Sequence, residues 1–144
     1  IALLGVLAAA TVGAVMVPAA GSGVSHAPIG TSPWSHEAVA KARSSGKPVF
    51  VYFTADWCLS CKANEAAAIN RSETRRAFKE ADVDIFVGDW TNGDPAIGRF
   101  LESQGRAGVP LYLWYAPGKP QPEVLPQILT QSMLIERARA HPRR

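Results

Sequence analysis

The chain has 144 residues, with 15 basic and 12 acidic side chains and a formal net charge of +3. The basic residues are dispersed except near the C-terminal end, and no aromatic residues are interleaved with that cluster, which argues against nucleic-acid binding. Two cysteines are too few for a disulfide-rich scaffold, and His26, His36 and His141 show no metal-ligand spacing relative to them. We therefore predict neither a metal site nor a cofactor.

The first segment of the chain is apolar. Residues 1–17 contain no charged side chain. A membrane-spanning helix needs about 20 apolar residues, so residues 1–20 are expected to be either a transmembrane helix or the hydrophobic region of a secretory signal. Because the sequence starts at Ile1 and not at Met, we expect a fragment or a processed product. Residues 21–33 are rich in Gly, Ser and Pro and are predicted to be a linker, and residues 34–144 are predicted to form one folded domain.

Helical and strand patterns alternate along this domain. Ser35 is placed to cap a helix over residues 36–42. Residues 49–53 are β-branched or aromatic and apolar on both alternating faces, which predicts a central strand covered on both sides. A second helix is predicted from residue 58 to residue 69, and it contains both cysteines.

The second half of the domain continues the alternation. We predict that Asn70 caps a third helix, with Glu73 at the reciprocal position. Asp94-Pro95 is typical of a helix start and Gly105 of its end, and Thr130 is placed to cap a final helix. Further strands are predicted at residues 83–87, 111–115 and 124–125. This order predicts an α/β fold with a central mixed sheet flanked by helices.

The two cysteines are separated by two residues, in the segment Trp57-Cys58-Leu59-Ser60-Cys61-Lys62. This spacing, after a strand and at the start of a helix, predicts a dithiol that opens and closes as a disulfide. Cys58 near the first helical position would face solvent, where free N–H groups and the helix dipole favour a thiolate. Cys61, one turn deeper, would attack a mixed disulfide formed at Cys58. A purely structural bridge is the alternative, although so short a loop constrains the unfolded chain little.

Two neighbours of the cysteines are candidate functional residues. Glu65 lies one helical turn beyond Cys61, on the face expected to meet the sheet. Our hypothesis is that Glu65 is partly buried and exchanges protons with Cys61, and the alternative is an exposed helix glutamate. Trp57 precedes Cys58 and is expected to shield one side of it and to contact a partner, unless it is a core tryptophan.

The segment Phe53-Thr54-Ala55-Asp56-Trp57-Cys58-Leu59-Ser60-Cys61-Lys62 resembles the active-site segment of thioredoxin-like domains. It is most similar to the C-terminal periplasmic domain of membrane thiol:disulfide interchange proteins of the DsbD family, including the suppressor-of-copper-sensitivity type. Gly88-Asp89-Trp90-Thr91-Asn92, Gly108-Val109-Pro110-Leu111-Tyr112 and Val124-Leu125-Pro126 continue the resemblance in order.

The resemblance implies a thioredoxin-like fold and a redox-active Cys58–Cys61 disulfide. It implies a cis Val109–Pro110 bond beside the dithiol, with Pro110 in the catalytic site and Val109 in contact with the partner. Glu65 matches an acidic position that tunes the cysteines of that family. The implied activity is a protein-disulfide reductase without cofactor. It would take reducing equivalents from a membrane-embedded dithiol domain upstream in the same protein and pass them to periplasmic disulfide proteins, with an N-terminal helix anchoring it in a bacterial inner membrane.

The sequence also departs from that family pattern. Thioredoxin-like domains often carry a buried acid six residues before the first cysteine, and this position is Tyr52 here. The Leu59-Ser60 pair differs from the inter-cysteine pairs of thioredoxin and of the oxidase DsbA, so the reduction potential cannot be carried over. A thiol oxidase or disulfide isomerase, and a module that binds copper or a client protein, therefore remain alternative functions.

Overall fold

The computed structural model describes residue 28 and residues 30–143. The predicted membrane or signal segment, residues 1–20, lies outside the described residues, as does most of the predicted linker. Within the described part, no helix is both long and apolar enough to cross a membrane. The elements in chain order are β1 (Ser32–Pro33), α1 (His36–Ser44), β2 (Val49–Thr54), α2 (Leu59–Asn64), η1 (Glu65–Ile69), α3 (Ser72–Glu80), β3 (Asp84–Asp89), α4 (Pro95–Ser103), β4 (Leu111–Tyr115), β5 (Glu123–Val124) and α5 (Gln131–Arg139).

The strands of the described residues form one mixed sheet in the order β1-β3-β2-β4-β5. β3 is parallel to both β1 and β2, whereas β4 is antiparallel to β2 and β5. The register pairs Thr54 with Asp89 and Phe53 with Leu111. The ends of β2 and β3 and the beginning of β4 therefore meet at one edge of the sheet. The predicted mixed sheet flanked by helices is confirmed.

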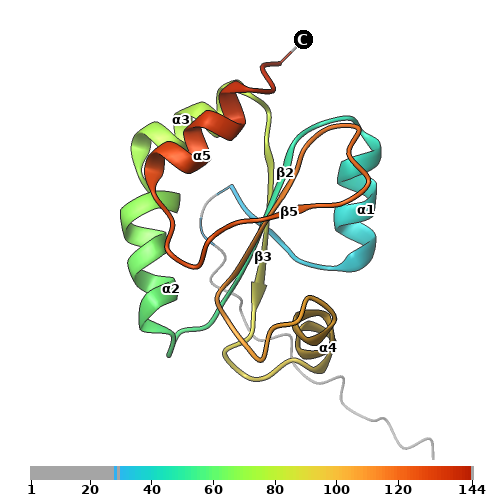
Figure 1. Ribbon diagram of the computed structural model, residues 1–144, viewed down its shortest axis with the longest axis vertical. Helices are drawn as coiled ribbons and strands as arrows, with labels where there is room; N and C mark the ends of the chain where they lie inside the picture. The colour runs from blue at the N-terminus through green and yellow to red at the C-terminus, as the bar shows by residue number, and fades with distance from the viewer. Residues whose placement is uncertain (1–27, 29, 144) are drawn as a thin grey trace, which may run out of the picture.

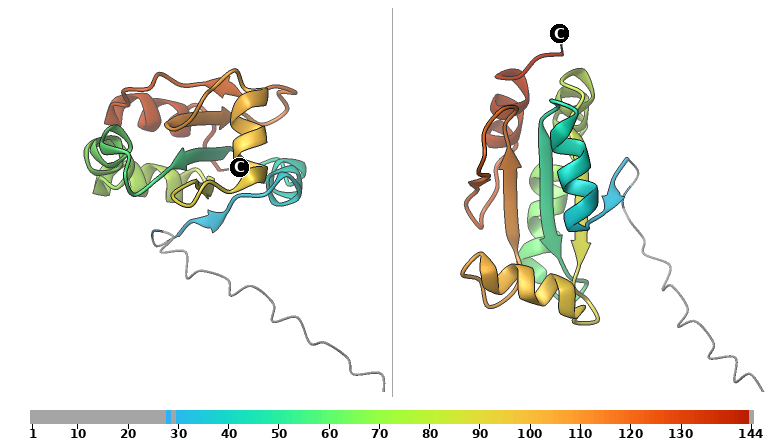
Figure 2. Two further views of the ribbon diagram at one scale, coloured as in Figure 1. Left: turned by 90° about the horizontal axis from the view of Figure 1, so that it is seen from below. Right: turned by 90° about the vertical axis from the view of Figure 1, so that its right-hand side faces the viewer.

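The buried strand β2 separates two apolar cores. Its side chains alternate between the two faces of the sheet, as those of any strand do. Phe50 and Tyr52 pack in the core that includes residues of η1, α3 and α5, while Val51 and Phe53 pack in the core that includes residues of α1 and α4. Figures 1 and 2 show α3 and α5 on one side of the sheet and α1 on the other. Covering of both faces explains why this strand lacks polar alternation.

The predicted helix starts are confirmed at three positions. The side chain of Ser35 accepts a hydrogen bond from the N–H of Ala38 at 3.0 Å, at the start of α1. Asp94 accepts from the first turn of α4, which has Pro95 at its first position. Thr130 accepts from the N–H of Met133 at 3.3 Å, at the start of α5. These side chains satisfy N–H groups that have no partner within the helix.

The prediction that Asn70 caps the third helix is wrong. The helix α3 begins at Ser72, and the residue at the cap position is Arg71, which makes no side-chain cap. The N–H of Asn70 instead donates to the carbonyl oxygen of Glu65 at 2.7 Å. Asn70 therefore closes the preceding element and lies two residues before the next one.

The predicted single helix over residues 58–69 is divided in the structure. Cys58 lies outside it as the N-cap, α2 ends at Asn64, and residues 65–69 form the π-helical turn η1. The hydrogen bond between Glu65 and Asn70 spans five residues, which widens the last turn. A hydrophobic pattern alone does not distinguish this wider turn from a regular one.

The sheet begins earlier than the predicted domain start at residue 34. Ser32 and Pro33, which we assigned to the linker, pair with Phe86 and Val87 as the edge strand β1. The N–H of Trp34 continues this pairing by donating to the carbonyl oxygen of Val87 at 2.8 Å. Proline is tolerated there because an edge strand needs hydrogen bonds on one side alone.

Candidate redox site

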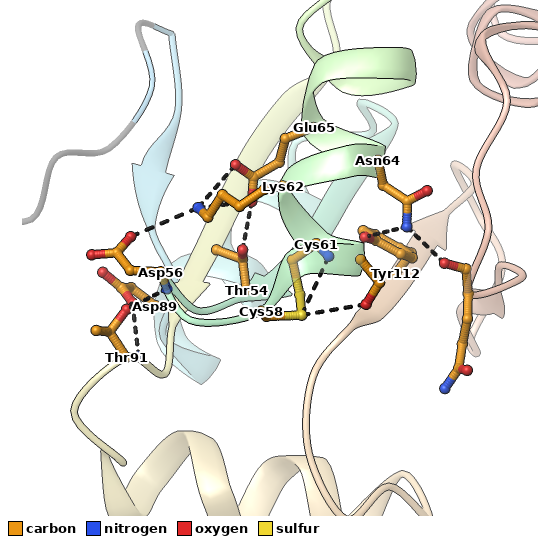
Figure 3. Close-up of a disulfide and its surroundings, with 12 residues drawn as sticks. Thr54, Asp56, Cys58, Cys61, Lys62, Asn64, Glu65, Asp89, Thr91 and Tyr112 are labelled. Atoms are coloured by element: carbon orange, nitrogen blue, oxygen red, sulfur yellow. Dashed lines mark hydrogen bonds and ion pairs between the residues drawn. A yellow bond between two sulfur atoms is a disulfide. The ribbon is translucent and has the colours of Figure 1, made fainter.

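The two cysteines form a disulfide where the chain passes from β2 into α2 (Figure 3). The N–H of Cys61 donates to the Cys58 sulfur at 3.2 Å, and the Ser60 hydroxyl lies 3.5 Å from the same sulfur. Cys61 is fully buried and Cys58 is 7% exposed, so Cys58 faces solvent less than its predicted position implies. As the N-cap, Cys58 turns its sulfur back towards the first helical turn.

A cis peptide bond between Val109 and Pro110 lies beside the disulfide. Val109 packs against a small apolar cluster that consists of Ala55 and both cysteines. The contact arises because β4, which starts directly after Pro110, is paired with β2. The resemblance implied this cis bond and its place, and the structure has both.

Trp57 is an exposed residue and not part of the core. Its side chain is 59% exposed, and its indole N–H donates to the carbonyl oxygen of Thr91 at 3.1 Å. The ring centroid lies 6.2 Å from that of Trp90. The indole therefore has a fixed orientation beside Cys58 while much of its surface stays in contact with solvent.

The loop after β3 supports this tryptophan, and sequence reasoning gave it no such role. The hydroxyl of Thr91 accepts a hydrogen bond from the N–H of Asp56 at 2.9 Å and donates to the carboxylate of Asp89 at 2.5 Å. The N–H of Thr91 also donates to Asp89, at 2.9 Å. No local pattern predicts this contact, because Asp56 and Thr91 are 35 residues apart.

Glu65 is partly buried, with a side chain that is 12% exposed. The hydroxyl of Thr54 donates to one carboxylate oxygen at 2.5 Å, and Lys62 Nζ lies 3.1 Å from the other. Lys62 also lies 3.7 Å from the carboxylate of Asp56. Figure 3 shows these groups on the side of α2 that faces away from Asn64. Among the described residues, no hydrogen bond joins the Glu65 carboxylate to the Cys61 sulfur, although the backbone N–H of Glu65 donates to the carbonyl oxygen of Cys61.

Tyr52 occupies the position where related domains often carry an acid. Its side chain is 1% exposed, and its hydroxyl has no hydrogen-bond partner among the described residues. Burial, and then the negative charge of Glu65, raise the pKa of Tyr52 well above that of a free tyrosine. Tyr52 therefore stays neutral near pH 7. A carboxylic acid at the same position could instead carry a negative charge or donate a proton.

Asn64 is a buried polar residue that sequence reasoning missed. Its side-chain amide donates to the Tyr112 hydroxyl at 2.9 Å and to the carbonyl oxygen of Gln127 at 2.6 Å. Its oxygen accepts from the N–H of Leu129 at 3.0 Å. The only sequence signal was an asparagine on the apolar face of a helix, three residues after Cys61.

The chemistry available at this site is that of sulfur. Within the described residues, no group of three or more His, Cys, Asp and Glu side chains is arranged to hold a metal ion. A disulfide accepts two electrons and two protons when it opens to a dithiol, and the reverse step closes it. The hydrogen bond from the N–H of Cys61 favours a negative charge on the Cys58 sulfur in the open form.

Comparison with known proteins finds relatives whose names also indicate thiol:disulfide chemistry. The chain is 35% identical over 81 residues to the thiol:disulfide interchange protein DsbD 1 of Pseudomonas aeruginosa, and 30% identical over 86 residues to DsbD of Vibrio cholerae. These matches cover 56% and 59% of the chain but only 13% and 14% of those much longer relatives.

A solved structure also resembles the fold. The chain superposes on the oxidised C-terminal domain of DsbD from Neisseria meningitidis with a TM-score of 0.58 and 26% sequence identity. That match covers 76% of this chain and 99% of the solved domain. A family model described as Thioredoxin-like matches residues 31–117, which is more than half of the 144 residues. The chain therefore belongs to the thioredoxin-like family.

Proposed function

We propose that this domain is a protein-disulfide reductase of the thiol:disulfide interchange type. Its Cys58–Cys61 pair takes reducing equivalents from a membrane-embedded dithiol and passes them to disulfide proteins of the bacterial periplasm. The observation that carries the proposal is the disulfide at the start of α2, in contact with Val109 beside the cis bond to Pro110. The matches to DsbD proteins support thiol:disulfide interchange as the general kind of reaction.

Reduction of the domain begins with a thiolate of the donor dithiol. It attacks the Cys58 sulfur, which is the more exposed of the two, and the Cys61 sulfur leaves as a thiolate. The second donor thiolate then attacks the donor sulfur bound to Cys58, which frees Cys58 and leaves the donor as a disulfide. Two electrons and two protons have moved to the Cys58–Cys61 pair.

Reduction of the substrate uses the same exchange chemistry, with the Cys58–Cys61 dithiol now acting as the donor. The Cys58 thiolate attacks a substrate disulfide and one substrate sulfur leaves, which produces a mixed disulfide at Cys58. Cys61 then loses its proton and attacks the Cys58 sulfur, so the second substrate sulfur leaves as a thiolate. Trp57 and Val109 border the reacting sulfur and are the proposed partner contacts, with Pro110 fixing the strand beside it.

The proposed setting is the periplasmic side of the inner membrane. Residues 1–20 would anchor the domain as a transmembrane helix, and the donor would be a dithiol domain upstream in the same protein. Attachment beside the donor raises the effective concentration of one dithiol near the other, which favours transfer between them. Proton handling at Cys61 is proposed to involve Glu65.

The test is the reduction potential of the Cys58–Cys61 pair, measured by equilibration with defined thiol buffers. A value near that of thioredoxin, about −270 mV, is expected for a reductant that feeds protein disulfides. A value near that of DsbA, about −120 mV, would instead assign the domain to thiol oxidation. If the pair cannot be reduced and reoxidised reversibly, the disulfide would instead be assigned a purely structural role.

A trapping experiment tests the division of roles between the cysteines. In Cys61→Ala, the mixed disulfide at Cys58 cannot be resolved, so partners should accumulate as covalent complexes that dissociate on reduction. The matched variant Cys58→Ala should trap far less, because Cys61 is fully buried. Equal trapping by the two variants, or none by Cys61→Ala, would contradict the roles assigned here.

A further inference from the structure

The end of the sheet opposite the disulfide is hollowed. Lys47 lies just before β2 and Cys58 lies after it, so the six residues of β2, at about 3.3 Å each, separate the two ends. Figure 1 shows the end of α5 and the start of α2 at opposite ends of the molecule. A cavity of about 670 Å³ lies at the end that contains Lys47, and its lining includes Lys47, Asp82, His141 and Arg143.

Two smaller cavities adjoin this one and are also basic. A cavity of about 380 Å³ shares Asp82 and Arg143 with it, and a cavity of about 310 Å³ shares Lys47. Of the described residues that line the three cavities, Asp82 is the one acid, and the basic residues are Arg43, Lys47, Arg75, Lys79, Lys119 and Arg143. We call this surface the basic end. Because the formal net charge of the whole chain is only +3, the rest of the chain is net negative.

The acid at the basic end orients two of the cations and neutralises only one of them. One carboxylate oxygen of Asp82 lies 3.1 Å from Lys47 Nζ, and the other lies 3.5 Å from the Arg143 guanidinium. The Lys47 and Arg143 side chains are 40% and 64% exposed. Both cations therefore border the largest cavity and remain accessible to an anion from solvent.

The chain that comes from the predicted membrane segment reaches the domain beside the basic end. Gly30 lines the second cavity together with Lys79 and Arg143, and a Cβ at Gly30 would lie 3.8 Å from the Arg75 guanidinium. Only residues 21–29 separate Gly30 from residues 1–20 in the sequence. Even fully extended, these nine residues reach about 30 Å. A bilayer that holds residues 1–20 is therefore within reach of the basic end.

We propose that the basic end binds anionic lipid headgroups of the membrane that holds residues 1–20. The inference rests on the membrane setting given in the proposed function. Anionic lipids attract basic side chains that lie within a Debye length of the bilayer, which is about 8 Å at physiological salt. The cavities give headgroup phosphates room between the cations, and Lys47 and Arg143 supply N–H donors to the phosphate oxygens.

This contact sets the orientation of the disulfide. With the basic end on the bilayer, Cys58 lies at the far end of β2 and is open to soluble disulfide proteins. The domain must leave the headgroups before its disulfide meets a membrane-embedded dithiol. Binding of anionic lipid therefore favours the step that reduces soluble substrates over the step that reduces the domain.

The experiment measures lysine modification in the full chain, reconstituted into lipid nanodiscs whose two faces are open to reagent. One preparation contains phosphatidylcholine alone, and the other contains equal parts of phosphatidylcholine and phosphatidylglycerol. A water-soluble amine reagent modifies the lysines, and mass spectrometry gives the rate at each. Lys47, Lys79 and Lys119 should react about tenfold more slowly on the anionic nanodiscs, as attraction of one or two basic side chains allows. Lys62, directly after Cys61 at the disulfide end, should react equally on both.

A pair of substitutions tests the assignment to the basic end. Lys79→Gln combined with Arg143→Gln should remove most of the protection of Lys47. The matched control is Arg99→Gln combined with Arg106→Gln, which removes the same charge from α4 and the turn after it, and it should keep the protection. Equal rates for Lys47 of the wild type on the two nanodiscs, or equal protection of Lys62, would overturn the inference.

Glycerol phosphate distinguishes a membrane contact from a site for soluble phosphate compounds. At millimolar concentration with neutral nanodiscs, it should leave the modification rate of Lys47 unchanged. Protection as strong as that on anionic nanodiscs would assign the cavities to a soluble ligand and overturn the membrane contact.

The lysine rates do not depend on thiol exchange, so the two proposals can fail separately. Protection of Lys47 in a protein whose disulfide does not cycle would contradict the reductase activity and support the inference. A disulfide that cycles in a protein without such protection would overturn the inference alone. A chain that co-elutes with neither nanodisc would contradict both the proposed membrane setting and the headgroup contact.

Discussion

At the scale of single residues, the carboxylate of Glu65 is a largely buried group near the disulfide. Thr54 and Lys62 each hold one of its oxygens, and the side chain is largely buried. These contacts agree with the partly buried position that we expected from its spacing to Cys61. Its role in proton exchange stays a prediction, because no hydrogen bond joins its carboxylate to the Cys61 sulfur among the described residues.

Glu65→Gln tests that role. The substitution removes a negative charge one helical turn from Cys61 and retains an oxygen that accepts from Thr54. Because a nearby negative charge disfavours a thiolate, we expect the pH profile of the exchange rate to move to lower pH in the variant. The control is Glu80→Gln, an exposed residue on α3 whose carboxylate lies 3.9 Å from Arg76. Profiles that coincide for both variants and the wild type would contradict a role for Glu65.

At the scale of elements, β2 and β3 pack closely at the edge of the sheet where the disulfide lies. Gly88 on β3 is paired with Phe53 on β2, and a Cβ at Gly88 would lie 2.3 Å from the Phe53 ring. That ring cannot easily move, because it is stacked on Phe100 at 5.1 Å and meets Trp34 at 5.2 Å. Glycine is therefore required at this position for space.

Gly88→Ala should destabilise the domain by about 1–3 kcal/mol through overpacking. The contrasting variant is Gly98→Ala on α4, where the nearest atom to the new Cβ is Trp90 Nε1 at an ordinary 3.6 Å. Since alanine is the better helix former, that variant should gain about 0.5–1 kcal/mol. Urea unfolding measures both changes. A neutral Gly88→Ala would mean that the two strands can separate without cost.

The helix α2 and the segment before α5 also meet at this scale. The side chain of Asn64 makes three hydrogen bonds, each with a residue at least 48 positions away. These hydrogen bonds fix the helix against β4 and against the chain before α5. The pattern of apolar residues predicted a helix here, and α2 and η1 occupy that range. The pattern did not predict that an asparagine within it would be buried.

At the scale of the whole molecule, buried tyrosines couple folding to alkaline pH. Burial raises the pKa of Tyr112 to about 12, and it also raises the pKa values of Tyr52 and Tyr115. An unfolded tyrosine loses its proton near pH 10. Between these values the folded state keeps protons that the unfolded chain has released, so the unfolding free energy falls as the pH rises.

We expect the domain to keep its full tyrosine contribution below about pH 10 and to lose stability from there towards pH 12 and above. Each phenol that is protonated only in the folded state contributes up to about 1.4 kcal/mol per pH unit. Chemical unfolding at a series of pH values measures this slope. Tyr112→Phe should lower it by one such contribution, and an unchanged slope would show that Tyr112 titrates normally.

The sequence by itself determined the features that depend on neighbours along the chain. The apolar run of β2, the caps Ser35, Asp94 and Thr130 and the spacing of Cys58 and Cys61 act within a few residues, so their local patterns predicted them correctly. Local patterns placed Asn70 wrongly, because a carbonyl five residues earlier takes its N–H.

Only the tertiary structure decided which side chains surround the disulfide. Thr91 reaches Asp56, Asn64 reaches Gln127 and Leu129, and Thr54 reaches Glu65 across elements that the sheet brings together. Whether Trp57 is buried or exposed also depended on the loop after β3. These contacts join residues that are 11 to 65 positions apart, so they depend on strand order and register, which no local pattern contains.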